Sequence, residues 1–454
     1  MYFSIQSFFD RLKKKGFLNS IIWLSTSSAI NIALNIFLAP IVSRIYGKED
    51  YGAAALFISV VTIMSVITTL MYPSAIIIPT EDQKAEKLTN LSFYLALFFS
   101  LLTFITLSVI YFFYGHLITS SAFESWIYLI PIGLIILVLD QVASQYNFRL
   151  KDFKRSARAN VISGISNKGI TIGTGLIFGS SQFGLLLGFL GSHIISFFVK
   201  AKMKVQSILF KKLNRRELKK TAIEFSSYPK YILPGDLINR LSRDFPLYFF
   251  TYSYDLQVVG SLAFANSMLS IPYNLISSSI SPVFIQKAKE LKENSTEKLR
   301  HFLVKLNNLL FLMGIIPFSI LTVFGEEIFE IVFSESWKEA GTFAGILAIY
   351  FMFRIIMSPM SSIFRVLEKE KITLVFNVFL FLGRALLLWL SSIYFSATNT
   401  LIIYSIFSAL AYLILLIITF NLVKLNWFKH TAPKLLAFGL SVLLLVGIKH
   451  LIFN

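Results

Sequence analysis

The sequence contains no cysteine, and it is poor in proline and in charged residues. The absence of cysteine excludes disulfide bonds, thiolate catalysis and metal sites with cysteine ligands. Only 15% of the 454 residues are charged, whereas a soluble domain has about 25%. A chain this long with so few charges cannot cover its own surface with polar groups. A cytosolic enzyme, a secreted disulfide-rich domain and a disordered tail are therefore excluded.

Hydrophobic residues make up 56% of the chain, and 46 residues are phenylalanine. A membrane-spanning helix needs about 20 mostly apolar residues, whereas a β-barrel strand needs only about 10. We therefore predict an all-α, polytopic membrane protein with about 12 transmembrane helices. The predicted spans are Asn19–Val42, Tyr51–Tyr72, Thr89–Phe113, Trp126–Asn147, Arg158–Gly179, Gln182–Val199, Tyr231–Tyr252, Val258–Val283, Leu306–Phe324, Ala340–Ile363, Ile372–Phe395 and Thr400–Val423.

The net charge of +18 comes from 42 basic and 24 acidic residues. If the N-terminus is cytoplasmic, 33 of the basic residues fall in cytoplasmic segments and only Arg44, Lys48 and Lys338 fall outside. Cytoplasmic loops of membrane proteins carry an excess of lysine and arginine. The distribution therefore predicts a cytoplasmic N-terminus, and it explains most of the charge without a nucleic-acid partner.

The two halves of the sequence resemble each other. Tyr51-Gly52 matches Val259-Gly260, and Phe148 at the end of the fourth span matches Phe364 at the end of the tenth. Parallel halves of six spans are a transporter architecture, with the binding site between the halves near the bilayer midplane. The predicted division is an N-terminal six-helix bundle at 1–205, a basic, solvated cytoplasmic linker at 206–230, a second six-helix bundle at 231–424 and a tail at 425–454. The apolar segment of the tail is either a thirteenth helix or an interfacial one.

Eight ionisable residues lie inside the predicted spans, where each costs about 2.5–3.5 kcal/mol on insertion scales. We expect them to face the bundle interior or water rather than lipid. They are Asp140, Lys168, Asp236, Arg240, Arg243, Asp244, Arg354 and Arg384. Five bases against three acids favour an anionic substrate.

Lys168 and Arg384 each follow their repeat-marker phenylalanine by 20 residues, so they occupy equivalent positions in the two halves. Each shares a polar helical stripe with an asparagine, Asn167 or Asn377 respectively. We expect both cations to face each other across a central cavity. The stripe of the first span, which includes Asn31 and Asn35, is either cavity lining or packing.

The seventh span carries a denser cluster, because four charged residues fall within one helical face. They are Asp236, Arg240, Arg243 and Asp244. Either these groups neutralise each other, or Arg240 or Arg243 is available to the substrate. Arg354 is the next candidate, since it has no acid nearby on its own helix. We expect Asp140 to pair with Arg354 or with Lys168.

Four stretches carry a resemblance to a known family. They are Leu38–Gly47 with Tyr51-Gly52, Ala75–Ala85, Asn147–Ser156 and Val332–Ala340 with Gly341. On these the chain resembles the polysaccharide transporter branch of the multidrug/oligosaccharidyl-lipid/polysaccharide exporter superfamily, the Wzx-type lipid-linked oligosaccharide (O-antigen) flippases. The usual family form has glycine where Ser334 stands.

The resemblance implies two six-helix bundles in a bacterial inner membrane, with a cationic cavity, and no enzymatic activity, cofactor or metal. The implied substrate is an oligosaccharide on a polyprenyl diphosphate, flipped from the cytoplasmic to the periplasmic leaflet. Membrane lipid and the glycan polymerase machinery are the implied partners. The candidate residues above follow from the placement of charges and not from the resemblance.

The sequence leaves two alternative functions open. A cation-coupled multidrug exporter of the same superfamily would need cavity acids, for which Asp140, Asp236 and Asp244 are the candidates. A membrane glycan polymerase or ligase would need a large outside loop with catalytic residues, and no predicted outside loop has that size. The five histidines show neither metal-binding nor catalytic spacing.

Overall fold

The computed structural model describes residues 15–118, 126–201 and 215–453, and every regular element in these ranges is a helix. Each of the twelve predicted spans lies mostly within one of these helices. The all-α fold class is therefore confirmed. Residues 206–214 of the predicted linker lie outside the described ranges.

The chain forms two compact units. Unit 1 comprises Met1–Ile45 and Leu56–Leu237, and unit 2 comprises Tyr46–Ala55 and Ile238–Asn454. Two helices, α3 (Lys48–Thr69) and α10 (Leu233–Ser253), belong partly to each unit. The first turns of α3 are thus part of unit 2, although most of this helix is part of unit 1.

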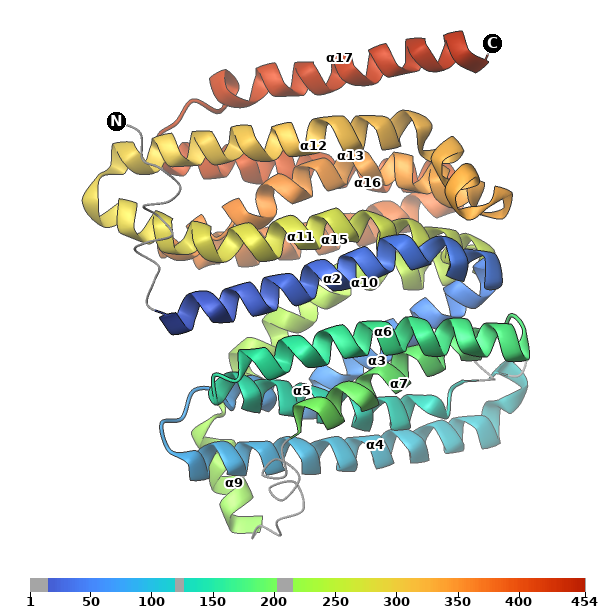
Figure 1. Cartoon of the computed structure of the whole chain (residues 1–454), viewed down its shortest axis with the longest axis vertical. Helices are drawn as coiled ribbons and strands as arrows, with labels where there is room; N and C mark the ends of the chain where they lie inside the picture. Colours follow the sequence, from blue (N-terminus) through green and yellow to red (C-terminus); the bar gives the residue numbers. More distant parts are fainter. Residues whose placement is uncertain (1–14, 119–125, 202–214, 454) are drawn as a thin grey trace. The chain divides into compact units, whose positions relative to one another are not determined.

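Figure 1 shows the long helices of unit 1 alongside one another. Within unit 1, α6 packs against both α2 and α7, and α5 packs against α4 and α7. Besides its long helices, the described part of unit 1 contains three short elements, which are included in the following order. In chain order the unit contains α2 (Lys15–Ile45), η1 (Tyr72–Ala75), α4 (Asp82–Ile118), α5 (Leu129–Arg149), α6 (Phe153–Phe178), α7 (Gln182–Lys200), α9 (Arg215–Glu224) and η2 (Tyr228–Ile232).

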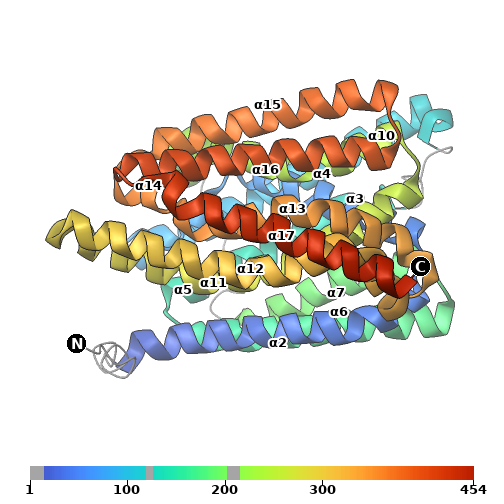
Figure 2. The same cartoon turned by 90° about the horizontal axis from the view of Figure 1, so that it is seen from above.

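In unit 2, α13 is the most buried helix, and it packs against α11, α12 and α16. Figure 2 shows α15 and α16 side by side and α17 crossing over the same unit. In chain order the unit contains α11 (Leu256–Asn294), α12 (Thr296–Phe333), η3 (Glu335–Trp337), α13 (Lys338–Met360), α14 (Ile363–Val366), α15 (Glu370–Tyr394), α16 (Ala397–Leu422) and α17 (Trp427–Phe453).

Within the described residues, 10 helices are long and apolar enough to cross a membrane, so the chain is a multi-pass membrane protein. Nine of them correspond to predicted spans. The three other predicted spans form α6, α10 and α11, which are not among these ten. The tenth helix is α17.

Helix α17 is longer than the uncharged part of the tail suggested, because lysines near its two ends have partners. The Lys449 ammonium lies 2.5 Å from a carboxylate oxygen of Glu327 and donates to the carbonyl of Val323 at 2.9 Å. Lys434 donates to the carbonyl of His430. The stretch Trp427–Ile452 is therefore long and apolar enough to cross a membrane, which favours a thirteenth helix.

Part of the basic linker docks on unit 1. Helix α9 packs along the start of α4, where Lys84 lies 2.7 Å from Glu224 and Lys87 lies 3.3 Å from Glu217. This part of the linker therefore packs on α4 through partly exposed ion pairs, while most of its residues remain exposed.

The motif stretches of unit 1 meet at one joint. Arg149, at the end of α5, donates to the carbonyls of Pro79 and, at 3.1 Å, of Thr80, and it lies 3.0 Å from a carboxylate oxygen of Asp82. One guanidinium therefore holds the turn that leads into α4. These two motif stretches, Ala75–Ala85 and Asn147–Ser156, therefore stabilise the fold of this unit and do not line a cavity.

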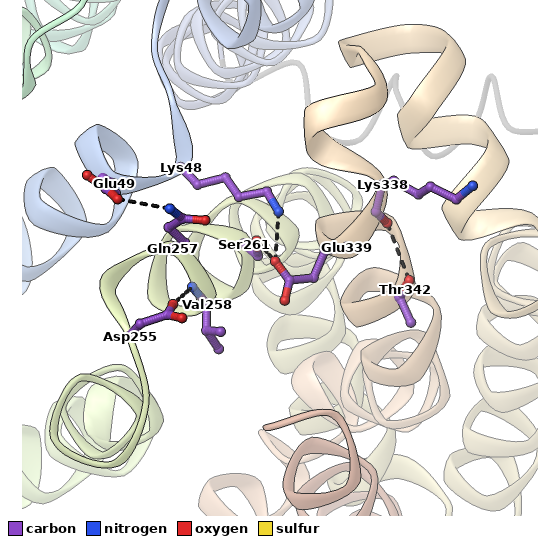
Figure 3. A network of polar contacts seen from close by, with 9 residues as sticks. All are labelled: Lys48, Glu49, Asp255, Gln257, Val258, Ser261, Lys338, Glu339 and Thr342. Atoms are coloured by element: carbon purple, nitrogen blue, oxygen red, sulfur yellow. Dashed lines mark hydrogen bonds and ion pairs between the residues drawn. The ribbon is translucent and has the colours of Figure 1, made fainter. Parts of the chain in front are cut away.

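The motif stretches of unit 2 meet at a second joint, shown in Figure 3. Lys48 lies 2.8 Å from Glu339, whose same carboxylate oxygen also accepts a hydrogen bond of 2.8 Å from Ser261. Gln257 donates to Glu49 at 2.9 Å. These contacts tie the start of α3 to α11 and α13.

Aromatic and glycine packing completes the second joint. The Tyr51 ring meets the Trp337 ring edge to face, with centroids 5.0 Å apart. A Cβ on Gly52 would come within 2.6 Å of the carbonyl oxygen of Leu256 and 3.1 Å of the backbone nitrogen of Gly260. Only glycine permits this close approach of α3 to α11.

Candidate functional site

Each unit contains a polar cavity. The cavity of unit 1 has a volume of about 320 Å³ and is lined by α2, α5, α6 and α7. The cavity of unit 2 has a volume of about 500 Å³ and is lined by α10, α11, α13, α15 and α16. Helices α6, α10 and α11, which are not among the ten long apolar helices, all contribute walls.

The two cavities occupy equivalent positions in the internal repeat. Three lining residues of α2 have counterparts on α10 that stand 208 residues later, and two of α6 have counterparts on α15 that stand 216 residues later. The pairs are Asn31 with Asn239, Leu34 with Ser242, Asn35 with Arg243, Gly164 with Leu380, and Lys168 with Arg384. The predicted equivalence of Lys168 and Arg384 therefore extends to a whole wall of each cavity.

In unit 2, Arg384 is almost completely buried, with 4% of its surface exposed. Its Nε donates to the hydroxyl of Ser408 at 3.0 Å, and its Nη1 donates to the carbonyl of Ser242 at 3.3 Å. Its guanidinium lies 4.9 Å from the centre of the Tyr404 ring. The Nη2 atom is buried without a hydrogen-bond partner among the described residues. Arg384 thus holds one N–H donor group without a partner at the cavity wall.

Arg354 lines the same cavity from α13. Its guanidinium lies 4.2 Å from the centre of the Tyr273 ring and 5.0 Å from that of Phe351, and Nη1 donates to the Tyr350 hydroxyl at 3.1 Å. Ring faces stabilise a cation through their quadrupole but leave its charge in place. Arg354 therefore remains a net positive charge in the wall.

Arg243 differs from the other two arginines of this cavity. Its Nε and Nη2 donate to the two carboxylate oxygens of Asp244, at 2.7 and 3.2 Å. Its side chain is also 53% exposed. The neighbouring acid thus offsets the charge of Arg243, in partial agreement with the predicted neutralisation within the cluster.

Among the described residues, no acidic side chain lines the unit 2 cavity, and neither Arg354 nor Arg384 has an acidic partner. Two uncompensated guanidiniums therefore share a cavity with the hydroxyl groups of Tyr273, Tyr350 and Tyr412. Guanidinium forks are well suited to bind phosphate oxygens in pairs. The chemistry of this cavity is that of an anion site.

In unit 1, the cavity wall contains Lys168 and the predicted asparagines Asn31, Asn35 and Asn167. Asn31 donates from Nδ2 to the carbonyl of Asn160 at 3.0 Å, while its Oδ1 is buried without a partner among the described residues. Lys168 has neither an ion pair nor a hydrogen bond within the described chain. The asparagines of the first span thus serve both as cavity lining and as packing contacts.

Asp140 lines the unit 1 cavity but pairs with neither Arg354 nor Lys168, so that expectation is wrong. Its Oδ1 lies 2.8 Å from the Lys200 ammonium, and its Oδ2 lies 3.0 Å from Nδ1 of His193. Both partners come from α7, where a separation of seven residues places them on one face, two turns apart. Neither partner is apparent from the sequence, because their approach to Asp140 depends on how α5 packs against α7.

Three further predicted residues do not line either cavity. Arg240 and Asp236 are absent from both walls, and Asp244 contributes only through Arg243. The cause is the helical register of α10, which turns Asn239, Ser242 and Arg243 toward the cavity. The tyrosines of the unit 2 cavity were missed as well, since aromatic residues are frequent throughout the chain. That Lys168 and Arg384 face each other stays a prediction.

Comparisons with known proteins agree with this architecture. A family model described as "Polysaccharide biosynthesis protein" matches residues 41–342. Among curated proteins, none matches the sequence.

Three solved structures are similar in fold. The lipid II flippase MurJ, in an inward closed conformation, is 14% identical, with a TM-score of 0.71 over 96% of this chain and 93% of that one. An inward-facing multidrug resistance MATE family transporter of the MOP superfamily is 15% identical, with a TM-score of 0.64 over 88% and 94%. A MOP superfamily transporter from Pyrococcus furiosus Vc1 (DSM3638) is 15% identical, with a TM-score of 0.57 over 91% and 96%.

Proposed function

The chain belongs to the polysaccharide biosynthesis protein family, and from this premise we propose that it is a flippase for an oligosaccharide linked to a polyprenyl diphosphate. The glycan is a repeat unit of O-antigen, capsule or a related polysaccharide. The protein moves it by alternating access from the cytoplasmic to the periplasmic leaflet of a bacterial inner membrane. It makes and breaks no covalent bond, and it is therefore not an enzyme.

The observation that carries the proposal is the pair of uncompensated guanidiniums, Arg354 and Arg384, in the cavity of unit 2. A diphosphate presents several oxygens that accept hydrogen bonds from such forks. The fold similarity to a lipid II flippase supports a lipid-linked substrate.

In the proposed cycle, the diphosphate binds to the cavity arginines from the cytoplasmic side while the polyprenyl chain stays in lipid. Lys168 contributes a further positive charge from the equivalent cavity of unit 1. Rocking of the two repeats then exposes the headgroup to the periplasm. Moving about two negative charges outward is favoured by about 4.6 kcal/mol per 100 mV of inside-negative potential, at about 2.3 kcal/mol per charge.

The orientation follows from the distribution of basic residues. We infer a cytoplasmic N-terminus, bundles at 1–205 and 231–424 around the linker at 206–230, and a C-terminal segment at 425–454. The membrane lipid surrounds the apolar helices. The product is a periplasmic lipid-linked glycan, the substrate of a polymerase, so we include the polymerase machinery among the partners.

Complementation of a deletion strain tests the proposal. Surface glycan is measured by immunoblot in cells that lack the gene and carry wild-type protein, an empty plasmid or the double variant Arg354→Ala/Arg384→Ala at matched membrane levels. We expect wild-type protein to restore the glycan and the double variant not to. Full restoration by the double variant would contradict the assignment of the cavity.

The rival function, cation-coupled multidrug export, draws on one observation, the acid Asp140 in the unit 1 cavity. Lys200 and His193 already occupy both of its carboxylate oxygens, which disfavours the binding of a cationic drug there. A susceptibility screen of the deletion strain against cationic drugs separates the functions. We expect unchanged inhibitory concentrations, and sensitivity that wild-type protein reverses would favour the exporter.

A further inference from the structure

The cluster of Asp140, His193 and Lys200 in unit 1 has no role in the function proposed above. Asp140 is 8% exposed and Lys200 is 5% exposed. The side chain of His193, in contrast, is 30% exposed and lines the cavity. Its ring and the Phe189 ring meet edge to face, with centroids 4.8 Å apart. The cluster thus consists of a closed ion pair and a histidine that the cavity can reach.

The hydrogen bonds fix which nitrogen of His193 carries the proton. An ionised carboxylate only accepts hydrogen bonds, so Nδ1, 3.0 Å from Oδ2 of Asp140, must be the protonated nitrogen. Nε2 then holds the lone pair of the neutral ring. Any further proton on this histidine is therefore bound at Nε2.

The charge of the cluster changes by a whole unit when that proton binds. With neutral His193, Asp140 and Lys200 cancel and the cluster is neutral. With protonated His193, the cluster carries one positive charge. The other titratable or charged group in this cavity wall is Lys168 from α6, while α2 contributes the neutral Asn31, Leu34 and Asn35.

The equivalent cavity of unit 2 has no corresponding histidine among its described lining residues. Its wall is built on fixed guanidiniums. Histidine is the side chain whose charge changes between about pH 5 and 8, whereas arginine stays charged. The two repeats therefore differ in whether their cavity charge depends on protons.

We propose that Nε2 of His193 is a proton-binding site linked to anion binding in the unit 1 cavity. A proton on His193 and a diphosphate-type anion beside Lys168 each strengthen the binding of the other, because linkage between two sites is reciprocal. The inference rests on the proposed function only in its choice of a diphosphate as the anion. The cavity of unit 2 binds its anion without this proton.

The test is a titration of the full-length protein in lipid nanodiscs, followed by NMR of isotope-labelled histidine side chains. His193→Gln identifies the His193 signal among the five histidines. The variant Arg354→Ala/Arg384→Ala removes the unit 2 site as a source of binding. In this background, we expect inorganic pyrophosphate to raise the titration midpoint of His193 by about one pH unit, which corresponds to about tenfold tighter anion binding by the protonated form.

Two variants make the test specific. Lys168→Ala should abolish the pyrophosphate-dependent change of the midpoint while the His193 signal stays present. The affinity of the His193→Gln protein for pyrophosphate is measured by calorimetry between pH 6 and 8. It should vary with pH only as far as the protonation of pyrophosphate itself requires. If His193→Gln does not fold, the signal is assigned by substituting the other four histidines in turn.

A midpoint of His193 that pyrophosphate does not move would overturn the inference. An unchanged pH dependence of affinity in a folded His193→Gln protein would overturn it as well. Neither result touches the proposed function, which stands on restoration of the surface glycan. Conversely, pyrophosphate could move the midpoint of His193 in a protein that restores no surface glycan. That result would refute the proposed flippase function and leave the linkage established.

Discussion

Arg384 shows how a single residue reveals a site in this protein. A guanidinium within a membrane span is costly, about 2.5–3.5 kcal/mol on insertion scales. The surroundings of Arg384 offset this cost with one hydroxyl, one carbonyl and two ring faces, but with no acid among the described residues. An arginine that only joined helices would be satisfied better by a carboxylate. Its uncompensated charge therefore points to an anionic ligand.

At the residue scale, Arg354→Ala and Arg384→Ala are each expected to reduce glycan export about tenfold or more. Loss of a hydrogen bond to a charged group costs about 1.5–3 kcal/mol, and each 1.4 kcal/mol is a factor of about ten. Arg240→Ala is the matched control, because Arg240 lies on α10 outside the cavity wall. Surface glycan per unit of membrane-inserted protein is the measurement. A larger loss from Arg240→Ala than from Arg384→Ala would contradict the assignment.

Arg149 provides a residue-scale prediction about stability. Arg149→Ala leaves the carbonyl of the buried Pro79 without its donor, at about 1–3 kcal/mol for a buried unsatisfied group, and it also removes the exposed hydrogen bond to the carbonyl of Thr80. We expect a clear decrease in the melting temperature of the purified protein. Arg155→Ala removes a partly exposed ion pair of 3.4 Å with Asp152 and a long hydrogen bond of 3.5 Å to the Val199 carbonyl, and it should change the melting temperature little. Equal effects of both variants would disprove the role of the Arg149 joint.

The sequence predicted the charged residues of the cavities better than their partners. Charge inside an apolar span is visible in the sequence, so Lys168, Arg354 and Arg384 were identified. The pairing of Asp140 with His193 and Lys200 depends on how α5 packs against α7, which no local pattern encodes. The absence of Arg240 from the cavity wall likewise depends on the rotation of α10.

Among the helices, the crossing of α3 and α11 depends on glycine. Gly52→Ala is expected to lower the yield and the melting temperature, because its Cβ would approach the Leu256 carbonyl oxygen to 2.6 Å. Gly173→Ala in α6 is the control, since a Cβ there meets no atom within 4 Å and alanine favours helix by about 1 kcal/mol. Fluorescence-detected size exclusion with a thermal ramp measures both. The prediction fails if the two variants behave alike.

The existence of the helices followed from hydropathy, whereas the positions of their ends did not. Apolar length locates the part of a helix that lipid surrounds, so α4 and α12 extend well beyond their predicted spans. Helices α6, α10 and α11 were found in the sequence by their length, and each contributes polar residues to a cavity wall. The polar residues of these helices thus build the sites.

For the whole molecule, the orientation and α17 together predict the side of the C-terminus. Twelve spans return the chain to the cytoplasm, and a thirteenth places the C-terminus in the periplasm. Alkaline phosphatase fused after Asn454 should therefore be active, and the same enzyme fused after Leu425 should be inactive. An inactive fusion after Asn454 would mean that α17 does not cross the membrane.

The repeat gives the molecule two equivalent cavities with different chemistry. Asn35 and Lys168 in unit 1 correspond to Arg243 and Arg384 in unit 2. The sequence predicted the repeat through its motif residues, yet those residues turned out to form the joints around Arg149 and Lys48. The cavity walls were recognisable as equivalent only after the lining residues were known.

In the proposed function, the cavity arginines carry a lipid-linked, diphosphate-bearing glycan outward. Its most direct test uses proteoliposomes with the oligosaccharide lipid in the inner leaflet, where a lectin added outside reports the headgroups that appear there. We expect wild-type protein to expose the glycan and Arg354→Ala/Arg384→Ala to expose it at the rate of protein-free liposomes. Exposure at that background rate with wild-type protein, or at the wild-type rate with the double variant, would contradict the account.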